Sequence, residues 1–197
     1  MSDGNSEREP FDESDLDALR RWLADNGSEW TLHEVVGYYT GAHIVPLLYK
    51  LSHLFWPVSG KSRMLLPEFK NAFAIIGPVY DPIPRMLERA PETVVPFRSD
   101  REAARQFCRG CLRALHKRFG WVEPEHDQDA ERAVLVVRAL AGRVAMKRLG
   151  KHPLVEGAPE VWLDRQRERL HEHVAALYRY RRVLERLDMR RATNRLN

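Results

Sequence analysis

Five cations recur at every fourth residue of one segment: Arg101, Arg105, Arg109, Arg113 and Lys117. If the segment is a helix, this spacing places the five side chains on one ridge that drifts slowly around the helix axis. Like charges four residues apart destabilise an isolated helix slightly. The ridge must therefore be neutralised by acidic side chains or used to bind an anion. Phosphate contact is the sharper hypothesis, and a solvated or internally paired face remains the alternative.

A second basic stretch runs from Tyr178 towards the C-terminus. Its arginines, together with Tyr178 and Tyr180, suit phosphate contact combined with stacking on bases. The candidate phosphate-binding residues here are Arg179, Arg181, Arg182, Arg186 and Arg190. The alternative is a helix laced with salt bridges, in which Glu185 pairs with Arg181 or Arg182.

The charge of the chain is unevenly distributed. Residues 1–100 hold 10 Lys and Arg against 15 Asp and Glu, whereas residues 101–197 hold 22 against 13. The first half therefore carries −5 and the second +9, which suggests an anionic partner for the second half. Two alternatives stay open: the acidic half folds against the basic half, or the arginines reflect a GC-rich genome.

Cys108 and Cys111 form a CxxC motif. A redox site needs this motif at the start of a helix that follows a strand, but here it falls in the middle of a predicted helix, on the apolar side. A zinc site needs a second ligand pair, and the tidy candidate, His171 with His173, points to two different sides of a helix. Two buried thiols are the prediction.

Other motifs match known sites only in part. Gly60-Lys61-Ser62 lacks the glycine and the strand that precede it in a phosphate-binding P-loop. Glu123/His126 and Glu168/His171 have the Glu-x-x-His spacing of di-iron bundles. Two such pairs are close to chance for this composition, and Pro124 interrupts the first. We predict no catalytic residue, no cofactor and no metal.

Capping patterns and apolar periodicity predict helices almost throughout. Ser14 is the expected N-cap of the first helix, and capping boxes are expected at Thr31–Glu34 and Ser99–Glu102. Pro91–Phe97 is expected to be extended. Further helices are predicted after Pro46, from Pro67 to Gly77, and over the ranges 85–89, 101–119, 127–149 and 160–191.

The fold class predicted is all-α: a compact bundle of about seven helices with a long basic C-terminal helix. Residues 1–12 are expected to form a disordered acidic tail and 13–197 a single helical domain, with a possible subdomain boundary near 98. Charged and proline residues interrupt the apolar window 35–56, so no membrane span is predicted. Two cysteines and no signal sequence favour a cytoplasmic location.

These features favour binding over catalysis. The prediction is a non-catalytic nucleic-acid-binding accessory protein, a small helical subunit of a larger nucleoprotein complex. Its partners are the backbone of DNA or RNA and other protein subunits, without a membrane. One alternative is a protein–protein adaptor whose arginines dock an acidic partner and whose tryptophans anchor the interface. Another is a helical metal-binding protein or enzyme that uses the Glu-x-x-His residues.

Overall fold

The structure is a computed structural model that describes residues 11–46, 51–59, 66–115, 123–124 and 127–194, except for the side chains of 51–53, 56, 66 and 187–194. All regular structure within these ranges is helical, which confirms the predicted fold class. The α-helices are α1 (Glu13–Asp25), α2 (Leu32–Ile44), α3 (Leu51–Ser59), α4 (Leu66–Tyr80), α5 (Ile83–Arg89), α6 (Arg101–Ala114), α7 (Gln128–Leu140), α8 (Met146–Leu149), α9 (Pro159–Glu168) and α10 (Leu170–Asn194).

Two central helices, α2 and α6, pack with their backbones in contact. A Cβ atom placed on Gly37 would lie 2.0 Å from the Phe107 carbonyl oxygen, and one on Gly110 would lie 1.9 Å from the Glu34 carbonyl oxygen. A Cβ on Gly41 would lie 2.7 Å from the Ala114 Cβ. Only glycine permits such an approach, because any other residue carries an atom in that space. The two helices run side by side in the same direction.

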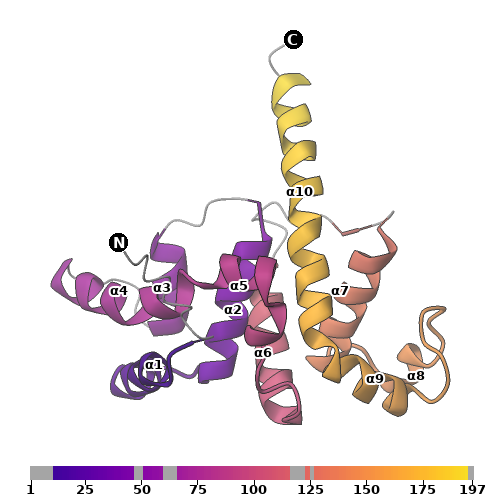
Figure 1. The fold of residues 1–197 in the computed structure, drawn as a ribbon, viewed down its shortest axis with the longest axis horizontal. Helices are drawn as coiled ribbons and strands as arrows, with labels where there is room; N and C mark the ends of the chain where they lie inside the picture. Colours follow the sequence, from indigo (N-terminus) through magenta and orange to yellow (C-terminus); the bar gives the residue numbers. More distant parts are fainter. Residues whose placement is uncertain (1–10, 47–50, 60–65, 116–122, 125–126, 195–197) are drawn as a thin grey trace, which may run out of the picture.

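The remaining helices flank this pair on two sides (Figure 1). Helices α1, α3 and α4 lie on one side and α7, α8 and α9 on the other, while α5 and the first half of α10 lie beside α2. The principal apolar core joins segments from both halves of the chain, from Phe11 to Leu184. A smaller cluster under α7, α8 and α9 consists of Val136, Ala139, Leu149 and Trp162.

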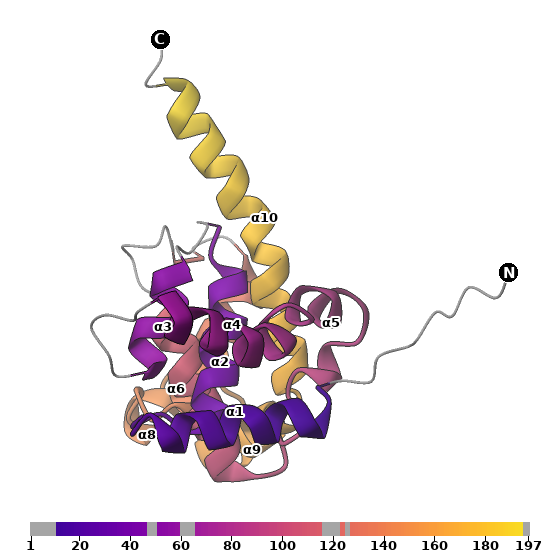
Figure 2. The same cartoon turned by 90° about the vertical axis from the view of Figure 1, so that its left-hand side faces the viewer.

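The C-terminal half of α10 projects beyond the body of the molecule (Figures 1 and 2). Its first half is anchored in the principal core by Leu170, Val174 and Leu177, each fully buried. Leu184 is still buried, whereas Val183 is 41% exposed and Arg186 is exposed. The long basic helix of the prediction is therefore present, with its start packed and its end extended away from the core.

Two helices that we expected to be continuous are each broken in two. The expected helix 127–149 ends at Leu140, and a turn with Gly142 at φ +74° separates α7 from α8. The expected helix 160–191 breaks at Arg169, between α9 and α10. The second break has a packing cause: Trp162 of α9 is buried in the smaller cluster, whereas Leu170 of α10 enters the principal core.

The N-caps of two helices differ from the prediction by one or two residues. Asp12, not Ser14, caps α1, and its carboxylate accepts from the Ser14 amide at 2.8 Å. Asp100, not Ser99, caps α6, accepting from the Glu102 and Ala103 amides at 2.8 and 3.1 Å. These amide bonds lower the pKa of the Asp100 carboxyl. Aspartate and serine are equally good caps, so composition alone does not choose between neighbours.

The capping box of α2 is confirmed. The Glu34 amide donates to the Thr31 hydroxyl at 3.2 Å, and the Thr31 amide donates to the Glu34 carboxylate at 3.3 Å. The end of α1 is also as predicted, with Asn26 as C-cap and Gly27 at φ +62°.

Three other expectations on local structure are wrong. The expected extended segment 91–97 is a 3₁₀ turn, Pro91–Thr93, followed by further turns that bury Val94 and Val95. Helix α4 continues through Pro78 to Tyr80 instead of stopping at Gly77. Helix α6 ends at Ala114 rather than near 119.

The two ends of the chain lie partly outside the described ranges. Phe11 and Asp12, assigned to the predicted tail, belong to the fold: Phe11 is 8% exposed and Asp12 caps α1. Residues 1–10, the rest of that predicted tail, lie outside the described residues.

Replacing the glycines at the α2–α6 contact tests its role. Gly37→Ala and Gly110→Ala each insert a methyl group into space held by backbone carbonyl oxygen, so the helices must separate. We expect each change to lower the free energy of unfolding by about 3 kcal/mol or more, measured by urea denaturation.

Gly77→Ala is the matched control, since its Cβ would meet nothing closer than an Asp81 carboxylate oxygen at 3.7 Å. Alanine favours a helix by up to about 1 kcal/mol over glycine, so this variant should be neutral or more stable. Equal effects of the three substitutions would contradict the contact.

Candidate nucleic-acid interface

Three arginines of the predicted ridge line one pocket. The pocket has a volume of about 210 Å³, and it lies between α6 and the turn that follows α7. Four positive charges and one negative charge surround it. Its lining consists of Glu34, Arg105, Arg109, Arg113, Ala141, Gly142 and Arg143.

Local structure accounts for the placement of these arginines. Helix α6 buries Ala104, Phe107, Cys108 and Cys111 on the faces towards α2 and the core, which leaves the ridge on the opposite side. Gly142 lets the chain turn sharply after α7. A Cβ on Gly142 would lie 3.8 Å from an Arg105 guanidinium nitrogen, so the turn sits directly against the ridge. Arg143, the next residue, forms the facing wall.

Two of the pocket arginines each have an acidic partner. A terminal nitrogen of Arg113 lies 4.0 Å from the Glu34 carboxylate, whose side chain is 10% exposed. The Arg113 guanidinium also lies 4.3 Å from the centre of the Trp30 ring, in a cation–π contact. Arg105 lies 3.5 Å from the Glu102 carboxylate. Within the described residues, the side chains of Arg109 and Arg143 have no hydrogen-bond or ion-pair partner.

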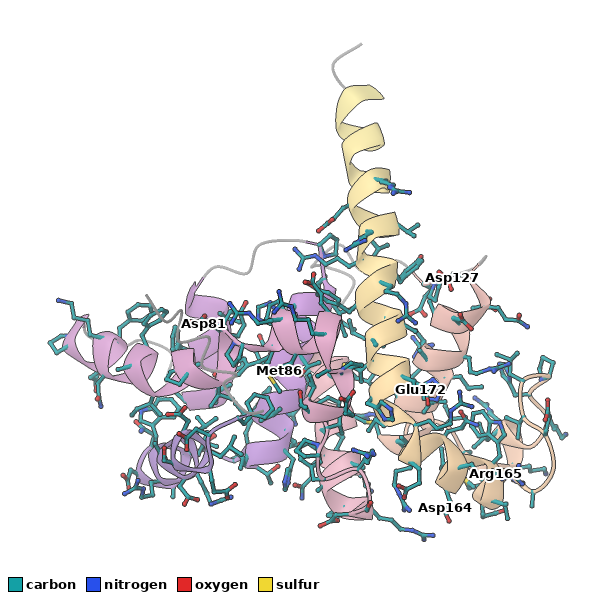
Figure 3. The ribbon with its side chains drawn as sticks, in the orientation of Figure 1. Asp81, Met86, Asp127, Asp164, Arg165 and Glu172 are labelled. Carbon is teal, nitrogen blue, oxygen red and sulfur yellow. The ribbon has the colours of Figure 1, made fainter. Side chains whose placement is uncertain are left out.

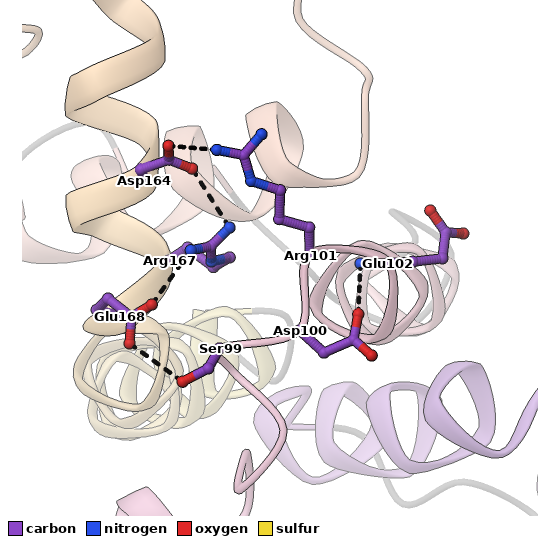
Figure 4. Close-up of polar contacts among 7 residues, drawn as sticks. All are labelled: Ser99, Asp100, Arg101, Glu102, Asp164, Arg167 and Glu168. Carbon is purple, nitrogen blue, oxygen red and sulfur yellow. Dashed lines mark hydrogen bonds and ion pairs between the residues drawn. The ribbon is translucent and has the colours of Figure 1, made fainter.

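The first ridge residue, Arg101, is directed elsewhere. Its guanidinium donates to Asp164 at 2.5 Å (Figure 4). Asp164 lies on α9 (Figure 3). Asp164 also pairs with Arg167, which in turn contacts Glu168 at 3.2 Å. The Ser99 hydroxyl donates to Glu168 at 3.5 Å. This network ties the start of α6 to α9, so Arg101 is internally paired. Lys117, the last ridge residue, lies outside the described residues.

The arginines of α10 also divide into two groups. Arg181 is half-buried, donating to Glu185 at 2.7 Å and to the His43 carbonyl oxygen at 2.8 Å. It thereby satisfies a carbonyl at the end of α2. Arg179, Arg182 and Arg186 share one face by their spacing and are exposed, without a partner among the described side chains. Arg190 lies further along α10, and its side chain is outside the described residues.

The two tyrosines of the predicted stacking surface differ in exposure. Tyr180 is 6% exposed, and its burial removes the ring faces from solvent, so it does not fit a stacking role. Tyr178 is only partly buried and donates to Glu88 at 3.3 Å, so stacking by its ring stays a prediction.

The two basic surfaces are separated along α2. Arg113 meets Glu34 near the start of α2, whereas Arg181 binds the His43 carbonyl near its end. Nine residues of helix separate these points, which is about 14 Å. A ligand that contacts both surfaces must therefore reach over a distance on the order of 14 Å.

The metal-binding alternative gains no support from the geometry. Among the described residues, no group of three or more His, Cys, Asp or Glu side chains gathers to hold an ion. Glu168 ends α9 and pairs with Arg167, while His171 belongs to α10. Glu123 pairs with Arg138 at 2.6 Å, and its expected partner, His126, lies outside the described residues.

The CxxC cysteines are free and fully buried in the principal core, as predicted. Burial raises the pKa of Cys111 to about 12 and that of Cys108 well above its ordinary value.

Two histidines are held neutral by burial. Burial lowers the pKa of His43 to about 4, although its hydrogen bond with the Tyr80 carbonyl opposes the shift, and nearby Arg181 lowers the pKa further. Burial likewise lowers the pKa of His173 to about 4, with Arg169 as the next cause. His173 bonds to Gln166 across the α9–α10 break at 2.9 Å. Both rings are structural elements of the helix contacts.

Two pocket residues, Glu34 and Arg143, were not predicted from the sequence. Glu34 was recognised as a capping residue, and its second role depends on the approach of α6. A signal for that approach was present, because Gly37 and Gly41 are four residues apart on one helical face. Arg143 had no such signal, since its position depends on the break at Gly142.

Comparison of the chain with protein-family models, with curated proteins and with solved structures gives no match. No described helix combines the length and apolarity that crossing a bilayer requires. The geometry of the basic surfaces is therefore the basis from which a function is inferred.

The buried histidines predict an acid-sensitive fold. In the unfolded chain a histidine binds a proton below about pH 6.5, whereas His43 and His173 resist protonation until about pH 4. The free energy of unfolding should thus fall as the pH drops from 6.5 towards 4, by on the order of 2 to 3 kcal/mol per histidine. Urea denaturation at pH 7 and pH 5 should show this loss. The double variant His43→Gln with His173→Gln should flatten the dependence, and an equally steep dependence in that variant would contradict the role of the two histidines.

The core thiols should be inert in the folded protein. Ellman's reagent should react with both cysteines in urea and with neither under native conditions, because thiolate formation is suppressed by burial. Rapid labelling of the native protein would contradict their assignment as core residues.

Proposed function

We propose that this protein is a non-catalytic nucleic-acid-binding accessory protein that holds the phosphate backbone of DNA or RNA with its arginines. The observation that supports this most strongly is the convergence of Arg105, Arg109, Arg113 and Arg143 on one pocket. A concave site with an excess of guanidinium groups is suited to phosphate, because the planar fork of arginine donates paired hydrogen bonds to its oxygens.

The exposed arginines of α10 support an extended contact. Arg179, Arg182 and Arg186 lie on one face of the helix, next to the half that projects from the body. Together with the pocket they provide two phosphate-binding surfaces. A strand or duplex long enough to reach from one to the other can contact both at once. We also propose that the protein acts as a small subunit of a larger nucleoprotein assembly, in which the projecting half of α10 contacts other subunits.

The salt dependence of binding tests the proposal. Neutralised phosphates release counterions, so log affinity should fall linearly with log salt, by about 0.9 per duplex phosphate contacted. The triple variant Arg105→Gln, Arg109→Gln, Arg113→Gln should weaken binding and reduce this slope by about 0.9 for each phosphate lost, at most about 2.7. The loss should be similar for unrelated sequences, because phosphates carry no sequence information. Fluorescence anisotropy with labelled DNA and RNA measures both quantities.

A matched control removes the same charge from the opposite side of the molecule. Arg20→Gln, Arg21→Gln and Lys70→Gln change exposed cations of α1 and α4 and should leave affinity and slope close to wild type. Equal effects of the two triple variants would show that net charge acts without a defined site. A wild type that binds neither DNA nor RNA at ~50 mM salt, where phosphate contacts are strong, would reject the proposal. A nuclease-resistant complex with an acidic protein would then favour the adaptor.

A further inference from the structure

We infer that the pocket between α6 and the α7–α8 turn binds a terminal phosphate monoester of a nucleic-acid strand in preference to an internal phosphodiester. This inference rests on the proposed function and deepens it, because it names the chemical group that the pocket selects. Three features support it: the uncompensated charge of the pocket, the placement of its two unpaired arginines, and the acidic partners that Arg101 and Arg113 already have.

The uncompensated charge of the pocket matches a dianion. Arg113 is paired with Glu34 and Arg105 with Glu102. Arg109 and Arg143 lack an acidic partner in the part of the chain that the structure describes. Two guanidinium charges thus remain for a ligand. An internal phosphodiester offers one negative charge, but a phosphate monoester carries roughly 1.5 to 2 at neutral pH.

The unpaired arginines reach the pocket from two different elements. Arg109 is half-buried in the middle of α6, and Arg143 follows Gly142 in the turn between α7 and α8. A phosphate between them can accept a guanidinium fork on each side. The three free oxygens of a monoester can accept from both forks, whereas an internal phosphodiester has two free oxygens and two ester links to accommodate.

The two arginines that flank the pocket centre along α6 offer little free charge to a strand that continues through the pocket. On one side, Arg101 is already bound by Asp164 at 2.5 Å. On the other side, Arg113 lies 4.0 Å from Glu34, which is buried and held in place by the capping box. The neighbouring phosphates of a strand that ran through would therefore meet arginines that already have acidic partners. A strand that ends in the pocket places only one neighbouring phosphate in such surroundings.

Oligonucleotides that differ only at their ends test the inference. Short labelled single strands of one sequence, with a 5′-phosphate, a 3′-phosphate or hydroxyl groups at both ends, are compared by fluorescence anisotropy. We expect one phosphorylated strand to bind at least roughly tenfold more tightly than the hydroxyl strand. The two phosphorylated strands distinguish a 5′ from a 3′ terminus as the ligand.

Substitutions in the pocket and a change of pH test whether the two unpaired arginines and the second charge of the phosphate cause this preference. Arg109→Gln with Arg143→Gln should reduce the ratio of affinities to about one, while Arg20→Gln with Arg21→Gln should preserve it. The ratio should also shrink between about pH 7.5 and about pH 5.5, because the second pKa of a phosphate monoester is near 6. Dividing by the affinity of the hydroxyl strand at each pH removes any effect of pH on the folded fraction.

Three results would count against the inference in different ways. Equal affinities for all strands, with the expected salt dependence, would overturn the terminal-phosphate preference and leave the proposed function intact. Binding of no strand would reject the proposed function and the inference together. A preference that persists in the Arg109/Arg143 double variant would show that another part of the protein reads the strand end.

Discussion

Backbone atoms of α2 and α6 meet without an intervening side chain at Gly37, Gly41 and Gly110, and this approach positions the parts of the candidate site. Glycine in a helix costs up to about 1 kcal/mol relative to alanine. Close packing of Phe107, Cys108 and Cys111 against the core offsets that cost, since all three side chains are fully buried. A looser crossing would lose this packing and also move α6 away from the N-terminus of α2.

The same contact determines the charge of the pocket. Because Gly110 packs against the Glu34 backbone, the Glu34 carboxylate is close enough to Arg113 to compensate one positive charge. Glu34 therefore has three structural roles: it belongs to the capping box of α2, it lines the pocket, and it compensates part of the positive charge of the ridge. The opposite wall depends on a second glycine, since Gly142 ends α7 and brings Arg143 towards α6. Glycines thus position both walls of the candidate site, while arginines supply its positive charge.

Local patterns predicted much of the helical content, because caps and apolar periodicity act over a few residues. The Thr31–Glu34 box, the end of α1 and the buried CxxC pair were all predicted correctly. The breaks at Gly142 and Arg169 were not. At Arg169 the chain has no proline or glycine, and the helix divides because Trp162 and Leu170 enter different cores. Such a break depends on tertiary packing, which periodicity along one helix does not contain.

The sequence predicted the ridge of cations but not which of them keep their charge free for a ligand in the pocket. Regular spacing identified Arg105, Arg109 and Arg113 correctly as neighbours, yet it treated all ridge cations as equivalent. Folding makes them unequal, because Arg101 pairs with an acid 63 residues away in sequence whereas Arg109 has no such partner. The arginines of α10 differ in the same way, since Arg181 binds a carbonyl 138 residues away. Arginines with such partners hold helices together, and each has less of its charge left for a ligand. The charge available for an anionic ligand is therefore what remains after these contacts have formed, and in the pocket it is concentrated on Arg109 and Arg143.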